Sequence, residues 1–522
     1  MNRLSYLFLP LTAIGVSACS SNKAKEEVKR PNIIFMMTDD HTTQAMSCYG
    51  GRLLQTPNMD RIANEGIRMD NCYAVNALSG PSRACILTGK FSHINGFTDN
   101  ASTFDGNQQT FPKLLQSAGY QTSIIGKWHL ITEPQGFDYW CILTGQHEQG
   151  DYYNPKFIKN GERVQREGYA TNIVTDLAIN WMDSIRDKSK PFCLFIHHKA
   201  PHRTWMPDLC DLDLYDDVTY PMPENFYDKY EGRIPASKQE MSIIKDMDLV
   251  YDLKMADKEN EIHTTTGLEE AGRNMYNALN PEQKAVWDKH YDPIIAKFKQ
   301  DKLTGKALAE WKYQQYMHDY MRVIHSIDRN VGRVLKYLEE NGLMENTMIV
   351  YTSDQGFYMG EHGWFDKRFM YEESFRTPLL VRLPGGKKGD VDEMVQNIDY
   401  GPTILDLAGV EVPADMHGVS FLPLLKGEKV PDWRKSLYYH FYEYPAEHAV
   451  RRHYGVRTER YKLMHFYNDI DCWELYDLQE DPMEMHNIYG QPGTEELVKE
   501  LKTELLRLQV QYDDPIRNIY KD

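Results

Sequence analysis

The chain has 522 residues, with 59 Lys and Arg against 76 Asp and Glu, which gives a formal net charge of −17. Hydrophobic residues make up 41% and aromatic residues 12%, which excludes a disordered or low-complexity chain. The length suits one large domain and a smaller one. The acidic balance argues against a nucleic-acid-binding protein, but not against an anionic substrate held in a locally basic cleft.

The first 30 residues have the pattern of an export signal followed by a tether. Arg3 precedes an apolar run at 4–16 that is too short to span a bilayer. Val16-Ser17-Ala18-Cys19 is typical of a bacterial lipobox, in which the cysteine receives the lipid that anchors the protein to a membrane. We therefore predict a lipoprotein signal peptide at 1–18, a polar tether at 19–30 and an exported bacterial lipoprotein, periplasmic or associated with the outer membrane. An ordinary cleaved signal with an incidental cysteine is the alternative.

From residue 31 to 417 the sequence alternates between strand and helix patterns. Strand-like apolar runs lie at 32–37, 120–125, 192–196, 348–351 and 378–382. Helical patterns lie at 56–66, 111–118, 168–185 and 316–338. The alternation predicts an α/β domain with a mostly parallel sheet covered on both faces. A polar, charged stretch at about 208–305 predicts a helical insertion, with a helix start at Asn280-Pro281.

The pattern changes at residues 418–522, which we assign to a small C-terminal subdomain. Short strand-like segments lie at 437–442, 453–457, 461–465 and 473–478. An amphipathic helix follows at 495–508. These elements predict a small antiparallel sheet with a helix, packed beside the main domain.

Two of the predicted strands end in oxygen-bearing side chains. Asp39 and Asp40 follow the first strand, and Asp354 and Gln355 follow the strand at 348–351. Ligands bind outside the carboxyl ends of strands in open α/β sheets, so we expect these side chains to meet. Carboxylates with an amide carbonyl favour a hard cation, Ca²⁺ or Mg²⁺. Taken alone, either pair is better explained as turn caps.

A further motif carries a resemblance to a known family. Ser79-Gly80-Pro81-Ser82-Arg83, followed by Leu87-Thr88-Gly89-Lys90, resembles the signature of the serine-type, formylglycine-dependent sulfatases, whose first Ser or Cys is oxidised to formylglycine. Other segments resemble that family's motifs in the family's order: the two acidic strand ends, Gly119–His129, Pro201-His202 and Gly363–Lys367. The resemblance covers about residues 30 to 480. It implies an alkaline-phosphatase-like α/β sandwich around a mostly parallel sheet, with a smaller C-terminal domain.

The resemblance implies one Ca²⁺ ion per chain, held by Asp39, Asp40, Asp354, Gln355 and the residue derived from Ser79. Many family members have Asn where this chain has Gln355, but the longer amide still offers a carbonyl oxygen. Formylglycine is hydrated to a geminal diol, so that one hydroxyl attacks sulfur and the second expels sulfate. This chemistry implies a sulfatase-maturating enzyme as a partner.

The same resemblance gives roles to the remaining motif residues. Arg83 would steady the diol and the carboxylates, while Lys127 and Lys367 would bind sulfate oxygens. His129 would accept the proton of the second hydroxyl. His202, or Lys367, would protonate the departing sugar oxygen.

The substrate is predicted from two segments and a turn. Asp151–Gly161 and His198–His202 look most like bacterial N-acetylglucosamine-6-O-sulfatases, which act on glycosaminoglycans. The resemblance therefore implies hydrolysis of the 6-O-sulfate of N-acetylglucosamine in heparin or heparan sulfate-type saccharides. His448 and Arg451 are our candidates for residues that read the sugar. Three alternatives stay open: a sulfatase for another position or glycan, a phosphatase or phosphodiesterase of the same superfamily with unmodified Ser79, and a non-catalytic glycan-binding lipoprotein.

Overall fold

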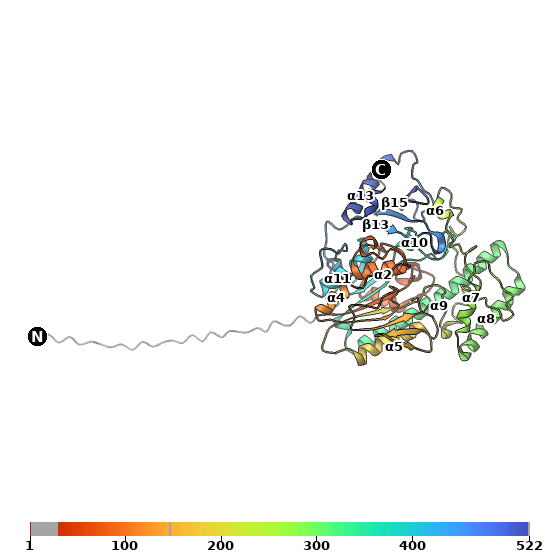
Figure 1. The fold of residues 1–522 in the computed structure, drawn as a ribbon, viewed down its shortest axis with the longest axis horizontal. Helices are drawn as coiled ribbons and strands as arrows, with labels where there is room; N and C mark the ends of the chain where they lie inside the picture. Colours follow the sequence, from red (N-terminus) through yellow and green to blue (C-terminus); the bar gives the residue numbers. More distant parts are fainter. Residues whose placement is uncertain (2–29, 146–147, 520–522) are drawn as a thin grey trace.

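The computed structural model describes residues 30–145 and 148–519, together with Met1. The predicted signal peptide and tether, Cys19 included, lie outside the described residues apart from Met1 and Arg30. The described chain forms a large α/β domain with a smaller sheet and helix on top of it (Figure 1). Among these residues, no helix combines the length and the apolar character needed to pass through a bilayer.

A ten-stranded sheet is the centre of the large domain, with strand order β11-β2-β10-β9-β1-β8-β4-β5-β6-β7. Its strands are β1 (Asn32–Thr38), β2 (Ile67–Met69), β4 (Gln121–Gly126), β5 (Tyr139–Thr144), β6 (Lys156–Lys159), β7 (Glu162–Gln165), β8 (Phe192–His197), β9 (Thr347–Ser353), β10 (Leu379–Arg382) and β11 (Gly389–Val391). The five central strands, from β9 to β5, run parallel. This confirms the predicted mostly parallel sheet. The strand predicted at 378–382 is present as β10, which pairs antiparallel with β9.

Alternating side chains of β1 show that both faces of this sheet are covered. Ile34 and Met36 face a cluster that includes Val323 of α9 (Gly305–Glu340) and Ile62 of α1 (Pro57–Glu65). Ile33 and Phe35 face a second cluster. That cluster includes residues of α2 (Ser79–Thr88), α4 (Phe111–Ser117) and α11 (Tyr400–Leu407). Burial on both faces explains the continuous apolar sequence of the central strands.

Shorter elements complete the large domain. The first face also carries α5 (Ala170–Asn180), which packs against α9. Two short strands, β3 (Cys72–Tyr73) and β12 (Val395–Gln396), form a separate parallel pair. Three short helices complete this domain: α3 (Ser92–Asn95), α10 (Glu372–Phe375) and α12 (Leu422–Leu425).

The predicted helical insertion is helical mainly in its second half. Residues 212–268 form turns and loops apart from α6 (Ile234–Ser237), so the prediction is wrong for that stretch. Pro221 and Pro223 lie in it, and proline prevents regular helix there. α7 (Glu269–Asn277) and α8 (Pro281–Asp301) follow and form the right-hand lobe of Figure 1. The predicted start of α8 is confirmed, because Asn280 accepts a hydrogen bond from the backbone N–H of Gln283 at 2.8 Å.

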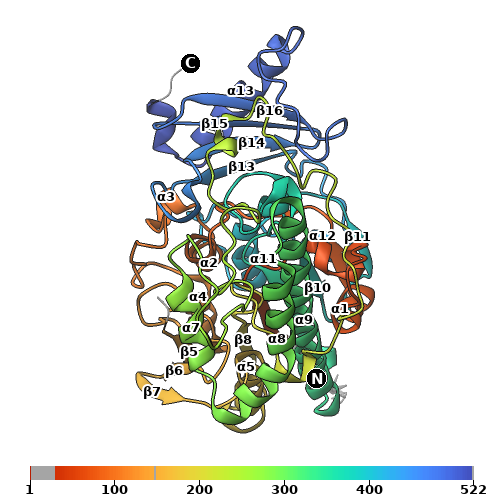
Figure 2. The ribbon, with the colours of Figure 1, turned by 90° about the vertical axis from the view of Figure 1, so that its right-hand side faces the viewer.

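The C-terminal residues form the predicted antiparallel sheet and helix. The strands β13 (Ser436–Phe441), β14 (His453–Thr458), β15 (Tyr461–Phe466) and β16 (Cys472–Asp477) pair in that order. α13 (Glu495–Gln511) covers one face, and the other face contributes Tyr439 and Phe441 to the core of the large domain. Phe421 and the leucines of α12 pack with the main sheet. The small sheet, at the top of Figure 2, therefore begins at Ser436.

Candidate active site

The two acidic strand ends meet at one edge of the main sheet. β1 and β9 pair in parallel with Thr38 beside Ser353, so Asp39 and Asp40 lie next to Asp354. One carboxylate oxygen of Asp354 accepts the backbone N–H of Asp40 at 3.2 Å. All three carboxylates are fully buried. The structure thus brings together the acids that the sequence predicted to meet.

Ser79 is placed against these acids by α2. It is the first residue of a ten-residue helix in which every residue is buried. Its Oγ donates a hydrogen bond to Oδ1 of Asp39 at 2.8 Å. Because Ser79 stands at the helix N-terminus, the helix dipole favours an anion beside it.

Three cations balance the three carboxylates. Arg83, one turn along α2, donates from Nε and Nη2 to Oδ2 of Asp354 at 3.1 and 3.0 Å. Lys127 contacts Asp39, and Lys367 Nζ lies 2.7 Å from Oδ1 of Asp40. This pairing offsets part of the cost of removing six charged groups from water.

Burial and these neighbours shift the pKa values of the site. Burial raises the pKa of Asp40 to about 6, although Lys367 opposes the shift. Burial holds the pKa of Lys127 well below its usual value, and Lys199 and Lys367 lower it further. Burial also lowers the pKa of Lys367, but Asp40 and Asp366 outweigh it and the net shift is upward. Lys367 is therefore the more firmly charged of the two lysines predicted to bind sulfate.

The two predicted histidines are buried near this cluster and have different neighbours. His202 Nε2 lies 3.9 Å from Oδ2 of Asp40, and His129 Nε2 lies 3.1 Å from Nε2 of Gln149. Burial lowers the pKa of both imidazoles well below the usual value, and Lys127 lowers both further. Both rings are therefore neutral before substrate binds, and each can accept a proton. An anion bound among the lysines would raise both pKa values.

The donor set fits a hard divalent cation. Nε2 of Gln355 donates to Oδ1 of Asp40 at 2.6 Å and lies 3.2 Å from Oγ of Ser79, whereas its Oε1 is buried without a partner among the described residues. A half turn of that amide exchanges the two atoms and aims the carbonyl oxygen at the cluster. Asp39, Asp40 and Asp354 supply the other oxygens, and Ca²⁺ prefers such ligands.

A cavity of about 520 Å³ opens onto Ser79. Its lining residues come from the large domain, the insertion and the C-terminal domain: Leu78, Ser79, Asn100, Gln149, Asp151, His202, Arg203, Tyr251, Ala271, Asn274, Met275, Ala278, Asp366, Lys367, Arg368 and Glu447. The insertion thus supplies one wall through α7, which the sequence did not indicate.

The two residues predicted to read the sugar do not line this cavity. His448 Nε2 lies 3.3 Å from Oδ2 of Asp366, so it sits behind a lining residue. Arg451 pairs with Asp469 at 3.0 Å and donates to the carbonyl of Lys238 at 2.7 Å. Glu447, the residue before His448, forms the wall instead, because the left-handed backbone at His448 (φ 66°) turns the loop there.

Several site residues were missed at the level of sequence. Arg203 pairs with Asp252 at 2.7 Å and with Glu447 at 2.9 Å, and Arg368 pairs with Glu443 at 2.9 Å. Both arginines directly follow motif residues, His202 and Lys367, and this adjacency was the available signal.

Lys199 is a third missed residue, close to the site although it does not line the cavity. It is buried, and burial lowers the pKa of its ammonium to about 8. Its Nζ lies 5.4 Å from the ring centre of Tyr152. Asp40 raises that pKa and Lys367 lowers it, so Lys199 adds positive charge to the field of the site.

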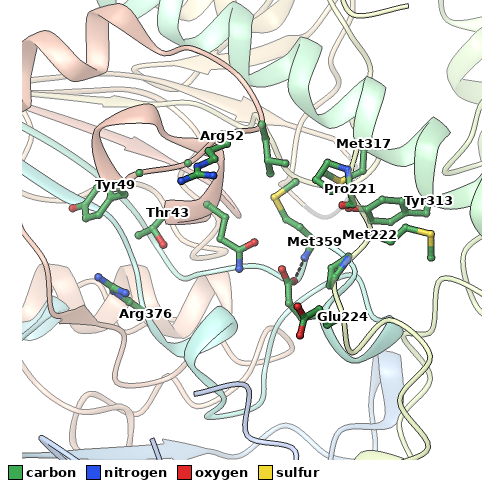
Figure 3. A pocket seen from close by; sticks show the side chains of 16 residues that line it. Thr43, Tyr49, Arg52, Pro221, Met222, Glu224, Tyr313, Met317, Met359 and Arg376 are labelled. Atoms are coloured by element: carbon green, nitrogen blue, oxygen red, sulfur yellow. Dashed lines mark hydrogen bonds between the residues drawn. The ribbon is translucent and has the colours of Figure 1, made fainter. Parts of the chain in front are cut away.

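A second cavity, of about 480 Å³, lies between the loop after β1, the insertion and α9 (Figure 3). Its lining mixes apolar, aromatic and charged side chains, among them Met317, Tyr313, Arg52 and Arg376. None of the predicted catalytic or metal residues lines it. The active-site assignment therefore concerns the cavity at Ser79.

Comparisons with known proteins agree with this geometry. The sulfatase family profile matches residues 31–410, and a profile for the C-terminal region of N-sulphoglucosamine sulphohydrolase matches residues 360–511. With its fold, its acidic strand ends and Ser79 on α2, the chain belongs to the sulfatase family, as predicted.

Individual relatives are more specific. An N-acetylglucosamine-6-O-sulfatase of Bacteroides thetaiotaomicron is 59% identical over 515 residues, which cover 98% of this chain and 91% of that protein. A solved structure, described as a complex with its substrate D-glucosamine-2-N,6-O-disulfate, matches with a TM-score of 0.90 and 58% identity over 93% of this chain and 99% of that one. A phosphonate monoester hydrolase of Agrobacterium radiobacter shares the fold, with a TM-score of 0.67 and 20% identity over 92% of this chain and 96% of that chain.

Proposed function

We propose that this enzyme hydrolyses the 6-O-sulfate of N-acetylglucosamine in heparin or heparan sulfate-type saccharides. The observation that carries the proposal is the position of Ser79, at the N-terminus of a buried helix, facing three carboxylates and two lysines at the floor of a cavity. The relative that is 59% identical is named for that activity, and the match covers 91% of its length.

The chemistry rests on Ser79 being oxidised to formylglycine and on a bound Ca²⁺, both of which we propose from family resemblance and from the oxygen donor set. The cation would lower the pKa of a hydroxyl on residue 79 and neutralise charge on the sulfate. Arg83 holds Asp354, and through it the acid cluster, in place. Lys127 and Lys367 would then turn from the carboxylates toward the sulfate oxygens.

Proton transfers fall to the neutral histidines and to Lys367. His129 would take the proton of the hydroxyl that expels sulfate, because its buried ring is unprotonated. Lys367 is the first candidate to protonate the departing sugar oxygen, because its raised pKa keeps a proton on it, whereas the lowered pKa of His202 leaves that ring without a proton to give. His202 becomes a donor only once bound sulfate has raised its pKa.

We further propose that the chain is an exported lipoprotein, attached through Cys19 to a membrane and matured by a formylglycine-generating enzyme. The lipobox and the polar segment before Arg30 support this proposal.

The substrate assignment predicts a strong positional preference. A 6-O-sulfate hangs on a primary carbon, so it reaches the recessed Ser79 while the ring stays at the mouth of the cavity. We expect kcat/KM for N-acetylglucosamine-6-sulfate to exceed that for 2-O-sulfated uronate or for galactosamine sulfates by about two to four orders of magnitude. A phosphate ester of the same sugar serves as the control for phosphatase chemistry. Preference for the uronate would refute the substrate, and faster phosphate turnover would refute the sulfatase reaction.

The insertion wall gives a second prediction. Asn274 lines the cavity from α7 and is exposed, so its truncation should leave the fold intact. Loss of one hydrogen bond to a neutral sugar hydroxyl, about 0.5–1.5 kcal/mol, should raise KM by about two- to tenfold in N274A. Asn277, exposed on the same helix and outside the cavity lining, provides the matched control N277A. An equal KM for both variants would show that α7 takes no part in substrate recognition.

A further inference from the structure

A basic surface lies at the edge of the main sheet opposite the active site. It surrounds a cavity of about 730 Å³, and its charged lining residues in the described chain are all cations: Arg30, Arg186, Lys188 and Lys190. We call these four residues the basal basic face. The cavity also touches Asn32, Pro191 and Asn346, which stand at the starts of β1, β8 and β9. Such a cluster contrasts with the net charge of −17 of the whole chain.

Two of the four cations already donate to backbone carbonyls, Arg30 to Ala118 and Arg186 to Met182, so the two lysines are the cations most open to a partner. Lys188 and Lys190 are exposed. Arg186 is half-buried over the ring of Phe192, 5.0 Å from its centre. Asp187 is one nearby acid; its carboxylate lies 4.0 Å from Nζ of Lys190 and accepts a hydrogen bond from the hydroxyl of Ser189 at 2.6 Å. Among the described residues that line the cavity there are four cations and no acid, so the lining is positively charged.

The position of the face relates it to the proposed anchor. β1 has seven residues and so spans about 20 Å, which separates the face from Asp39 at the other end of the strand. Arg30 is the last residue of the predicted tether. The chain from Cys19 to Arg30 reaches at most roughly 40 Å when fully extended. A lipid on Cys19 would therefore keep the basal basic face near the bilayer surface.

We propose that the basal basic face docks on the anionic phospholipid headgroups of the membrane that anchors the enzyme. This inference rests on the proposed lipoprotein anchor. Basic residues close to an acidic leaflet are attracted within about one Debye length, roughly 10 Å at 0.1 M salt. Docking through this edge of the sheet holds the opposite edge, with Ser79 and its cavity, facing away from the lipid and toward arriving glycan.

The test uses the chain 19–522 with Cys19→Ser, so that no acyl chain contributes; the described fold begins at residue 30 and is retained. Partition onto phosphatidylcholine vesicles is measured with and without phosphatidylglycerol, at low and high salt. We expect binding that requires phosphatidylglycerol and weakens with salt. K188E/K190E should reduce partition about tenfold or more. The control K499E/K502E makes the same change in net charge on α13, which lies at the top of Figure 2. The basal basic face is at the other end of the molecule, because α5, which leads toward Arg186, lies at the bottom of that figure.

Three outcomes would overturn the proposal: no preference for phosphatidylglycerol, unchanged binding by K188E/K190E, or an equal loss in the control. If the vesicles were not bound but immobilised heparin retained the parent and not K188E/K190E, the face would be a glycan surface instead. Lipidation of Cys19, measured by mass spectrometry on the chain made in cells, and turnover of N-acetylglucosamine-6-sulfate are scored separately. Failure of the anchor or of the sulfatase activity is thus distinguished from failure of the docking face.

Discussion

Replacing Ser79 with alanine is expected to lower kcat/KM for N-acetylglucosamine-6-sulfate by about four to six orders of magnitude, the range seen when a nucleophile is removed. Ser79 contacts the acid cluster through Asp39 and also lines the cavity. In the active wild type, the peptide carrying residue 79 should be about 2 Da lighter than a serine peptide, because formylglycine has two hydrogens fewer. A carbonyl reagent should label it.

The matched control is Ser92→Ala, because Ser92 is also buried and hydrogen-bonded but lies outside the signature motif. It should keep its turnover within a few-fold and retain the aldehyde at position 79. Full activity from an untouched Ser79 would rule out the formylglycine mechanism.

Removing the metal, or one of its ligands, is the second change with a large expected effect. Chelation should abolish turnover, and Ca²⁺ should restore it better than Zn²⁺, because the proposed ligands are all oxygens. Asp354→Asn should lose at least about a thousandfold in kcat/KM, as expected when a metal that activates the nucleophile is lost. Asparagine is preferable to alanine here, because Arg83 would otherwise be left buried without its partner, at a cost of about 3–5 kcal/mol.

The readout independent of activity is thermal unfolding. Ca²⁺ should raise the Tm of the wild type and leave that of Asp354→Asn unchanged. Asp328→Asn is the control, because Asp328 is a buried carboxylate that binds the backbone N–H of Asn58 and Met59 at the start of α1. It should lower Tm but keep the Ca²⁺ shift. An equal Ca²⁺-induced rise in Tm in Asp354→Asn would show that the strand-end acids do not bind the ion and serve as turn caps.

The main sheet and the strand-end acids were predictable because their signals are local. β1 and β9 are continuous apolar runs that end in acids, and parallel strands bring such ends together. β6 and β7 were missed, because Lys156–Lys159 and Glu162–Gln165 are short, partly exposed edge strands with little apolar pattern. The loops at 212–268 were misassigned since their turns depend on packing against α9 and the site.

The sugar-binding wall was less predictable than the catalytic centre. Asn274 and Tyr251 lie in the insertion, far from Ser79 in sequence, and no motif surrounds them. Their proximity to the site depends on how the insertion folds back over the sheet. The turn at His448 was located correctly in the chain, but which of its side chains faces the cavity depends on the left-handed backbone at His448 and Ala449.

The register of β1 also orders events during synthesis. Asn32 pairs with Thr347, so the centre of the sheet cannot close until the ribosome has made more than half of the chain. Until then α2 lacks the surfaces that bury it, and Ser79, 1% exposed in the finished fold, is on an open chain. A maturating enzyme that needs access to this serine has its opportunity in that interval. The same late closure would keep the polypeptide unfolded during the export that we propose.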